Sequence, residues 1–447
     1  MDDHKQETVE GKLEEALQKQ TNEEILSALR EISTKLDNIK WQLDFNTERQ
    51  KYLNAFFGSE LLKLQQVSGD GILLCGNYGN PNTGDEWMLD TMISYIRKYT
   101  TREITVMLEP NRNFDPSIYL KYGIRYIHYP QTVYDYDMIA DQFDILIFGG
   151  GAIVEDNVYY DAYDFGVNIC RTVVDLPLRF IKKRKKVLCI GLSTSTEFTN
   201  AGYINKLQTV IDHVDYFSVR DRYSLETMQR AGINTDRVKL IPDIVFGNEK
   251  LRKMISEDTY RLEQRDQDIL HIGIVYIVAY ETKKGFLNLI NKIKTEASAS
   301  GKQYHITLIP FYDDWHIDDQ FFKDSTKDEQ NIEVLPYCSD IQFMIDIFEK
   351  QDIVVCARYH AILLALCLGI PCVPLYFDTH QHYRNKVSYL MEQFDLSLKD
   401  CVVMSELAAG EKEDLLDHHL VRGEKDQAEK WIQDARQQLE DLFGVYL

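Results

Sequence analysis

The apolar residues in the first part of the chain follow a different period from those in the rest. Within this polar stretch they recur in alternating steps of four and three, at Ile25, Leu29, Ile32, Leu36, Ile39 and Leu43. That spacing is typical of the apolar stripe of a coiled coil. Because a single helix cannot bury such a stripe in water, we expect residues 1–66 to be a helical coiled-coil segment that makes the protein a homo-oligomer. Packing of the stripe on the chain's own body is the alternative.

From residue 67 onward, short apolar runs alternate with amphipathic stretches. The runs are Ile72–Cys75, Ile104–Leu108, Ile145–Phe148, Val187–Ile190, Tyr216–Val219, Lys239–Ile241, Ile269–Val278, Tyr304–Ile309, Glu333–Leu335, Ile353–Val355 and Cys372–Leu375. Alternation of this kind predicts parallel strands whose connecting helices cover both faces of a sheet. A charged stretch, Asn248–Asp268, divides the runs into two series.

Two such series predict an α/β fold with two Rossmann-like domains in a GT-B-like arrangement. We place the first domain at residues 67–255 and the second at 256–405, and we interpret residues 406–447 as a C-terminal helical segment. In such an arrangement we expect the chemistry to lie between the two domains, at the carboxyl ends of the strands.

Composition and charge narrow the possible partners and the compartment. The chain has 447 residues, 44% of them hydrophobic, and a formal net charge of -21. That acidity argues against binding nucleic acid or an anionic membrane through general charge attraction. The basic run Lys182–Lys186 is interpreted as a solvated helix end. The cysteines are scattered, the N-terminus is polar and no long apolar run occurs, so we expect a cytoplasmic protein. Peripheral association with the inner face of a membrane stays open.

The most chemically informative stretch follows the predicted strand Ile353–Val355. Arg358 and His360 come directly after this strand, and an apolar helix then leads to Gly369 and Pro371. An arginine grips carboxylate or phosphate through paired hydrogen bonds, and a histidine can transfer a proton near neutral pH. The pair therefore predicts an enzyme that handles an anionic small molecule.

Two glycine-containing loops follow strands of the first series. The segment Asn82–Glu86 follows the first strand, and we expect a helix to begin near Glu86. Asp85 either caps that helix, or binds or deprotonates a sugar hydroxyl. The run Gly149–Gly151 follows the third predicted strand. It indicates close approach of the backbone, either to a ligand or in a tight strand–helix crossing.

Further charged residues follow other predicted strands. Arg220 leaves the strand Tyr216–Val219, before a helix that we expect to start at Ser224. Arg220 either binds an anion or forms a structural ion pair with Asp221 or Asp243.

A polar and cationic stretch follows the last predicted strand. It ends at Lys386, at the start of an expected helix, Val387–Met391. Lys386 is either a solvated helix residue or a ligand of the anion. His380 and His382 lie in the same stretch, but no carboxylate or cysteine set completes a metal site around them, so no metal is predicted.

Taken in order, four of these motifs resemble those of the polysaccharide pyruvyl transferase family. They are Asn82–Glu86, Phe148–Gly151, Ser218–Asp221 with Ser224, and Arg358–Ala361 followed by Gly369–Pro371. The resemblance extends over about residues 70 to 400. The N-terminal segment lies outside the family pattern. The long loop Gly76–Pro81 and the insert His380–His382 depart from the pattern in detail and leave the acceptor open.

The resemblance implies phosphoenolpyruvate as donor and transfer of its pyruvyl group onto two hydroxyls of one sugar, with formation of a cyclic ketal and release of phosphate. The sugar would belong to a cell-surface polysaccharide, such as an exopolysaccharide or a capsule, or to a lipid-linked, nucleotide-linked or polymeric precursor. No cofactor is expected.

Roles for individual residues follow from the same resemblance. Arg220, Arg358 and Lys386 would bind the donor, and His360 would transfer a proton. Asp85 is the candidate for orienting or deprotonating the acceptor. The remaining candidates are acceptor or loop contacts: Asn82, Thr83, Gly84, Gly150, Gly151 and Asp243.

Two other functions are compatible with the same sequence features. A glycosyltransferase that uses a nucleotide-sugar donor would share the architecture, the glycine loops and the basic residues. A coiled-coil scaffold that carries a degenerate transferase body would need no intact site. The two arginines, one from each half, favour a compact trianion over a long nucleotide diphosphate.

Overall fold

The computed structural model describes residues 71–79, 81–108, 122–129, 135–156, 169–194, 197–256, 268–277, 283–299, 301–312, 317–378, 381–409 and 415–447. The chain divides into two units, Met1–Gly58 and Ser59–Leu447, and all of the described residues belong to the second unit. The predicted coiled-coil segment, residues 1–66, lies outside the described residues.

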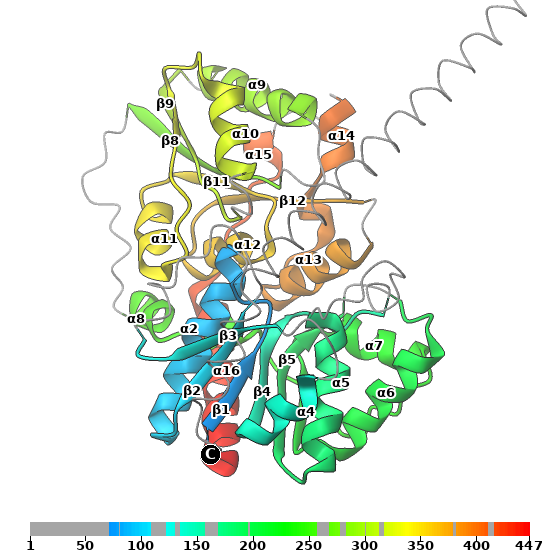
Figure 1. The fold of residues 1–447 in the computed structure, drawn as a ribbon. Helices are drawn as coiled ribbons and strands as arrows, with labels where there is room; N and C mark the ends of the chain where they lie inside the picture. The colour runs from blue at the N-terminus through cyan, green and yellow to red at the C-terminus, as the bar shows by residue number, and fades with distance from the viewer. Residues whose placement is uncertain are drawn as a thin grey trace, which may run out of the picture. The chain divides into compact units, whose positions relative to one another are not determined.

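The first half of the described chain forms a parallel sheet of seven strands in the order β3-β2-β1-β4-β5-β6-β7 (Figure 1). The strands are β1 Gly71–Cys75, β2 Ile104–Leu108, β3 Arg125–His128, β4 Phe143–Ala152, β5 Lys186–Ser193, β6 Tyr216–Val219 and β7 Val238–Leu240. The strand order reverses between β1 and β4. In open α/β sheets, ligands bind beyond the carboxyl ends of the strands at such a reversal.

Helices cover both faces of this sheet. They are α2 Thr83–Tyr99, α4 Asp135–Gln142, α5 Ile169–Lys182, α6 Ala201–His213, α7 Arg222–Arg230, the 3-10 turn η2 Ile244–Gly247, and α8 Glu249–Ser256. Successive side chains of β1 point to opposite faces of the sheet, because side chains alternate along a strand. Ile72 and Leu74 join the core that contains α2, whereas Leu73 and Cys75 join the core that contains α4, α5 and α6.

The second half repeats the plan with six parallel strands in the order β10-β9-β8-β11-β12-β13. The strands are β8 Ile269–Val275, β9 Gln303–Leu308, β10 Ile332–Val334, β11 Ile353–Cys356, β12 Cys372–Tyr376 and β13 Val402–Val403. The helical elements are α9 Lys283–Ala299, α10 Ile317–Thr326, α11 Ile341–Phe348, α12 Tyr359–Cys367, α13 Gln381–Gln393, η5 Leu398–Asp400, α14 Met404–Ala409, α15 Leu415–His418 and α16 Lys425–Tyr446. The strand order reverses between β8 and β11, which places α12 at the second reversal.

The last helix, α16, packs against elements of the first half although it follows the second sheet in sequence. Its contacts include η2, α2 and α8, and Figure 1 shows α16 in red close to α2. The ring of Phe443 stacks on Tyr95 of α2 with centroids 6.0 Å apart. The indole of Trp431 donates from Nε1 to the carbonyl of Gln393, at the end of α13, over 2.6 Å. One helix therefore contacts both halves.

The α/β fold class predicted from the sequence is confirmed, and every predicted run overlaps a strand. Two strands were missed. β3 is short and only partly buried, and β13 has two residues, so neither has a long apolar run. The strand before Gly149–Gly151 is consequently the fourth, and it continues through the glycines to Ala152. The domain boundaries stay predictions.

Three helix starts were wrong. α2 begins at Thr83, α7 begins at Arg222 and α13 begins at Gln381, each before the expected start. The run Lys182–Lys186 lies at the end of α5, where Lys182 and Arg184 are exposed and the other three residues are half-buried. Lys185 donates to the carbonyl of Phe143 over 2.7 Å.

Among the described helices, none combines the length and the apolar character that crossing a membrane requires.

Candidate active site

The N-terminus of α2 is held by loops of the second half. Asn82 is the N-cap, and its side chain accepts a hydrogen bond from the backbone of Gly84 at 3.3 Å. The backbone N–H of Thr83 donates to the carbonyl of Phe311 over 3.0 Å, and Asn82 forms an isolated bridge with Tyr312. The expected capping role of Asp85 is thus filled by Asn82. Asp85 lies in the first turn, where its side chain is available for other contacts.

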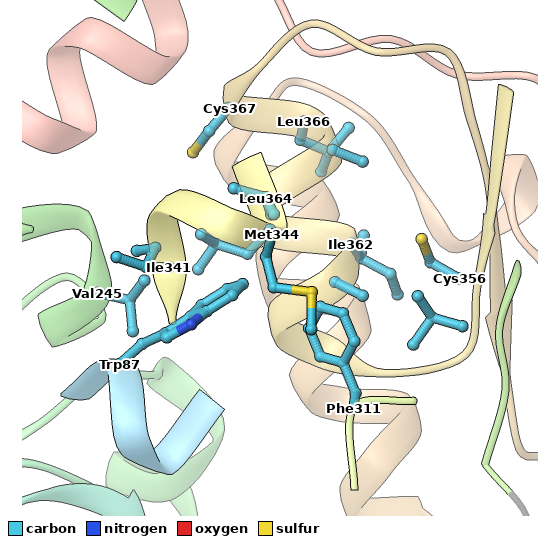
Figure 2. Close-up of a cluster of buried hydrophobic side chains, with 14 of the residues drawn as sticks. Trp87, Val245, Phe311, Ile341, Met344, Cys356, Ile362, Leu364, Leu366 and Cys367 are labelled. Carbon is cyan, nitrogen blue, oxygen red and sulfur yellow. The ribbon is translucent and has the colours of Figure 1, made fainter. Parts of the chain in front are cut away.

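Trp87 anchors the same turn in the apolar core of the second half. Figure 2 shows its ring beside Ile341 and Met344 of α11. The ring also meets Phe311 edge-to-face with centroids 5.6 Å apart, and its Nε1 donates to the carbonyl of Ser339 over 3.1 Å. A fully buried tryptophan with a satisfied N–H is a rigid anchor. The first turn of α2 is therefore fixed relative to α11 and α12.

Gly84 provides the space for the imidazole of His360. A Cβ added at Gly84 would lie 1.8 Å from Nδ1 of His360. His360 itself lies in the first turn of α12, directly beyond β11. This contact explains the glycine in the first turn of α2, and it places His360 beside the residue that precedes Asp85.

Asp85 is a buried carboxylate next to several cations. Its Oδ2 accepts a hydrogen bond from Nδ2 of Asn77 at 2.7 Å. Burial raises the pKa of Asp85, and the hydrogen bond from Asn77 and the charges of His360, Arg220 and Lys386 only partly oppose that rise. A carboxylate with a raised pKa is a better proton acceptor than an ordinary aspartate.

Arg220 and Asp243 form a buried ion pair. Nη1 of Arg220 donates to Oδ2 of Asp243 over 2.6 Å, and the two side chains are 5% and 1% exposed. The guanidinium also lies 5.0 Å from the centroid of the Tyr359 ring. Although burial opposes it, the guanidinium of Arg220 holds the pKa of Asp243 well below its usual range. In turn the carboxylate overcomes the burial of Arg220 and raises its pKa.

His360 faces the same carboxylate from the other half of the chain. Its Nε2 lies 3.6 Å from Oδ2 of Asp243. The imidazole is also edge-to-face with Tyr359 at a centroid distance of 5.0 Å and with Trp87 at 6.5 Å. Arg220 and His360 therefore meet at one oxygen of Asp243, although they follow strands of different sheets.

Lys386 is a buried cation, so its interpretation as a solvated residue is wrong. Its side chain, on α13, makes no hydrogen bond or ion pair with the described residues, and Lys386 is 8% exposed. Burial, reinforced by the charge of Arg220, lowers the pKa of Lys386 to about 8, and the carboxylates of Asp221, Glu155 and Asp85 oppose that shift. Lys386 is thus available to an incoming anion.

The glycines after β4 permit close packing against α2. Gly150 and Gly151 have φ angles of 79° and 96°, which non-glycine residues rarely adopt. A Cβ at Gly150 would lie 2.4 Å from Sδ of Met88, and one at Gly151 would lie 3.9 Å from Oδ1 of Asp85. The tight strand–helix crossing is observed, and it brings the end of β4 beside Asp85.

Arg358 lies near this group but contacts a different aromatic ring from Arg220. It occupies the N-cap position of α12 without a side-chain capping bond, and its guanidinium lies 4.9 Å from the centroid of the Tyr312 ring. Tyr312 pairs with Asn82, and Arg358 precedes Tyr359, which lies against Arg220. Arg358 is thus near the other candidates, but its described ring contact is with Tyr312 and not with the Arg220–Asp243 pair.

The fold therefore brings the predicted residues to one place, and it adds others that sequence reasoning left out of the site. Asn77 orients Asp85, Tyr359 lies against Arg220, and Tyr312 lies against Arg358. Glu155, just beyond β4, has a pKa raised by burial and lies near Lys386. For Asn77 and Tyr359, the available signal was their position in the loop Gly76–Pro81 and in the motif Arg358–Ala361; Tyr312 and Glu155 lie in no quoted motif. A lone tyrosine or asparagine gives no indication of its partner.

One cavity of the described chain lies away from this cluster of charged residues. A cavity of about 300 Å³ runs between α2, η2 and α16, lined in part by Lys98 and Glu440, which pair with each other at 2.7 Å. The buried charge cluster is chemically more informative than this cavity, whose charges already have partners. Among the described residues, no three histidine, cysteine or acidic side chains gather to hold a metal ion.

Comparison with known proteins identifies the family of the chain and solved structures with a similar fold. A family model described as polysaccharide pyruvyl transferase matches residues 82–379, which is more than half of the chain. No curated protein sequence matches the chain.

Two of the similar solved structures hold UDP-GlcNAc or UDP. UDP-GlcNAc 2-epimerase from Neisseria meningitidis, bound to UDP-GlcNAc, is 10% identical, with a TM-score of 0.50 over 83% of this chain and 100% of that one. The S. aureus MnaA–UDP complex has the same identity and TM-score, over 83% of this chain and 97% of that one. At this identity the likeness concerns the fold alone, and it confirms the GT-B-like arrangement of two Rossmann-like halves.

Proposed function

Since the chain belongs to the polysaccharide pyruvyl transferase family, we propose that this transferase uses phosphoenolpyruvate as donor and forms a cyclic ketal on two hydroxyls of one sugar. The observation that carries the proposal is the meeting of cations and proton carriers from both halves. Arg220 and Asp85 come from the first half, and His360 and Lys386 come from the second. Asp85 is within electrostatic reach of the other three.

The donor would be bound by three cations. Phosphoenolpyruvate carries up to three negative charges, and arginine can pair with both phosphate and carboxylate in a bidentate manner. Arg220 and Arg358 would hold the phosphate and the carboxylate of the donor. Lys386, whose ammonium has no hydrogen-bonded partner among the described residues, would add the third positive charge. Burial of these groups strengthens each interaction relative to water.

The first chemical step would join the sugar to the donor. The oxygen of one hydroxyl attacks C2 of the enolpyruvyl group while His360 delivers a proton to C3, so that the methylene becomes a methyl group. Asp85, with its raised pKa, would take the proton of the attacking hydroxyl. That proton then restores His360.

The second step would close the ring. The C2–O bond to phosphate breaks with its electron pair leaving on the phosphate oxygen, and the second hydroxyl forms the second C2–O bond. The proton of the second hydroxyl ends on the released phosphate. Arg220 and Lys386 would stabilise the charge that develops on the leaving phosphate. No resident cofactor or metal takes part in these proposed steps.

The acceptor would be a sugar of a polysaccharide or of its precursor, in keeping with the family. Asn82, Thr83, Gly84, Gly150, Gly151 and Asp243 were expected to contact the acceptor or its loops. The first three lie at the N-terminus of α2, Gly151 borders Asp85, and Gly150 borders Met88 of α2. A screen of lipid-linked, nucleotide-linked and polymeric sugars, read out by phosphate release from phosphoenolpyruvate, would identify the acceptor.

The deciding experiment is a thermal-shift titration of the full chain with phosphoenolpyruvate, beside UDP-sugars and GDP-sugars. A ligand that binds only the folded protein raises Tm with concentration. We expect phosphoenolpyruvate to raise Tm, and we expect Arg358→Ala to abolish the shift. Arg230→Ala, which removes an arginine paired at the surface with Glu197, is the matched control and should retain the shift.

If only a nucleotide-sugar raises Tm, the proposal is wrong and the protein is better described as a glycosyltransferase. If the Arg358→Ala and Lys386→Met variants both still bind phosphoenolpyruvate, the donor site has been assigned to the wrong residues.

A further inference from the structure

One oxygen of Asp243 faces two functional groups. Oδ2 accepts a hydrogen bond from Nη1 of Arg220 at 2.6 Å, and the same atom lies 3.6 Å from Nε2 of His360. The second distance is too long for a formed hydrogen bond. Nε2 is buried and has no hydrogen-bond partner among the described residues, so Oδ2 is the acceptor toward which it is directed.

The rest of the Asp243 carboxylate is fixed. Its Oδ1 accepts from the backbone N–H of Val245 at 2.9 Å, which caps η2. Asp243 is 1% exposed, so water does not compete for either oxygen. Arg220 is fixed in turn by the ring of Tyr359. The carboxylate is therefore a rigid acceptor placed between a phosphate-binding candidate and a proton-transfer candidate.

We propose that Asp243 is a positioning residue that holds His360 as its Nε2–H tautomer and couples it to Arg220 through one shared oxygen. A donor phosphate bound by Arg220 competes with Asp243 for the guanidinium. Oδ2 then becomes free to shorten its contact with Nε2–H, because catalytic hydrogen bonds often tighten only when substrate is bound. Asp243 was expected as an ion-pair partner of Arg220 or as an acceptor or loop contact, so a positioning role toward His360 is different from the predicted ones.

With the proton of the neutral ring on Nε2, the unprotonated ring nitrogen is Nδ1, on the side of Gly84. The charged and titratable groups around the Arg220–Asp243–His360 unit are Asp85 from α2, Asp221 next to Arg220, Tyr359 from α12 and Lys386 from α13. Among the ion-pair contacts of the described residues, Nε2 of His360 faces Asp243.

The first test uses the unmodified protein and does not depend on activity. Two-bond proton–nitrogen correlation spectra of the full chain labelled with ¹⁵N-histidine report which ring nitrogen carries the proton. The signals of His360 are those lost in His360→Gln. We expect the neutral imidazole to be protonated on Nε2. A neutral ring protonated on Nδ1 would overturn the inference.

The second test concerns the coupling and rests on the proposed function. In Asp243→Asn the single amide oxygen can still accept from Val245, but the charge that favours imidazolium is gone. We expect kcat to fall on the order of 100-fold or more, as for loss of general acid catalysis. The alkaline limb of the kcat/KM profile should also move to lower pH.

Asp156→Asn is the matched control. Asp156 is also a buried carboxylate that accepts from the backbone, at Asn200 over 2.6 Å, and its loss should leave the pH profile in place. A uniform loss of activity at every pH in Asp243→Asn would show a merely structural role and overturn the coupling. If the wild-type protein transfers no pyruvyl group, the proposed function fails, and the tautomer measurement still decides the role of Asp243.

Discussion

The contact between Gly84 and His360 shows how a single missing side chain can matter at a site. Helical glycine normally destabilises a helix by about 0.5–1 kcal/mol relative to alanine. Here a Cβ would lie 1.8 Å from Nδ1 of His360, so the ring would have to move. The steric cost of a Cβ beside His360 outweighs the gain in helix stability that alanine would bring. Glycine at this position therefore allows the observed position of the imidazole.

Gly84→Ala is therefore expected to lower kcat on the order of 100-fold, since a displacement of about 1 Å at a catalytic group has an effect of that size. Phosphate release from phosphoenolpyruvate in the presence of acceptor is the measurement. Gly444→Ala is the control, because a Cβ at Gly444 would make only ordinary contact with Tyr99 at 3.5 Å. That variant should keep its activity and gain stability. Full activity in Gly84→Ala would contradict the placement of His360.

Lys386 illustrates the conflict between stability and binding at one residue. A pKa lowered to about 8 means that the folded protein disfavours the ammonium. Relative to an ordinary lysine, whose pKa is about 10.4, this corresponds to a cost of about 3 kcal/mol at pH 7. A side chain that destabilises the fold in this way is suited to a ligand that brings negative charge.

Lys386→Met should accordingly raise Tm at pH 7 and weaken phosphoenolpyruvate binding. The gain in stability should shrink as the pH rises from about 8 toward the ordinary lysine range, because lysine is then neutral in the folded wild-type protein and carries no charge to bury. Lys399→Met, at an exposed lysine, is the control for both readouts. The proposed role is wrong if donor affinity in Lys386→Met equals that of the wild type.

At the scale of elements, helix starts were the least accurate part of the sequence interpretation. Asn82 and Asp221 cap α2 and α7, and both were passed over in favour of later residues. Several residues of each loop could cap a helix, since asparagine, aspartate, serine and threonine are all good N-caps. For α2 the choice depends on backbone contacts with Phe311 and Tyr312 from distant sequence, which no local pattern contains.

The helix α16 gives a testable case of an element whose partner lies far away in sequence. Leu439 is 2% exposed, and its Cδ1 lies 2.7 Å from the position that a Cβ on Gly247 would take. Leu439→Ala should lower the free energy of unfolding by about 2–5 kcal/mol, which is typical for a buried leucine. Chemical denaturation is the measurement. Gln437→Ala, on the exposed side of the same helix, should change stability little. Equal effects of both substitutions would contradict the docking of α16 on the first half.

For the whole molecule, the likeness to solved structures concerns architecture, while the family match concerns activity. The fold is similar to that of UDP-GlcNAc 2-epimerase from Neisseria meningitidis, which is only 10% identical. The same fold therefore serves different chemistry, as is common for α/β folds. The assignment to pyruvyl transfer accordingly depends on residues such as Arg220, Arg358 and His360, and not on the arrangement of the sheets.

The sequence by itself determined the fold class and most of the strands, because buried parallel strands and their covering helices impose local apolar patterns. It also indicated which residue types could carry the chemistry, since arginine can bind anions and histidine can transfer protons. Only the tertiary structure decided that Arg220 and His360 share Asp243, that Gly84 makes room for a ring, and that Lys386 is buried. Those relations join residues of different sheets, and the packing of one half on the other creates them.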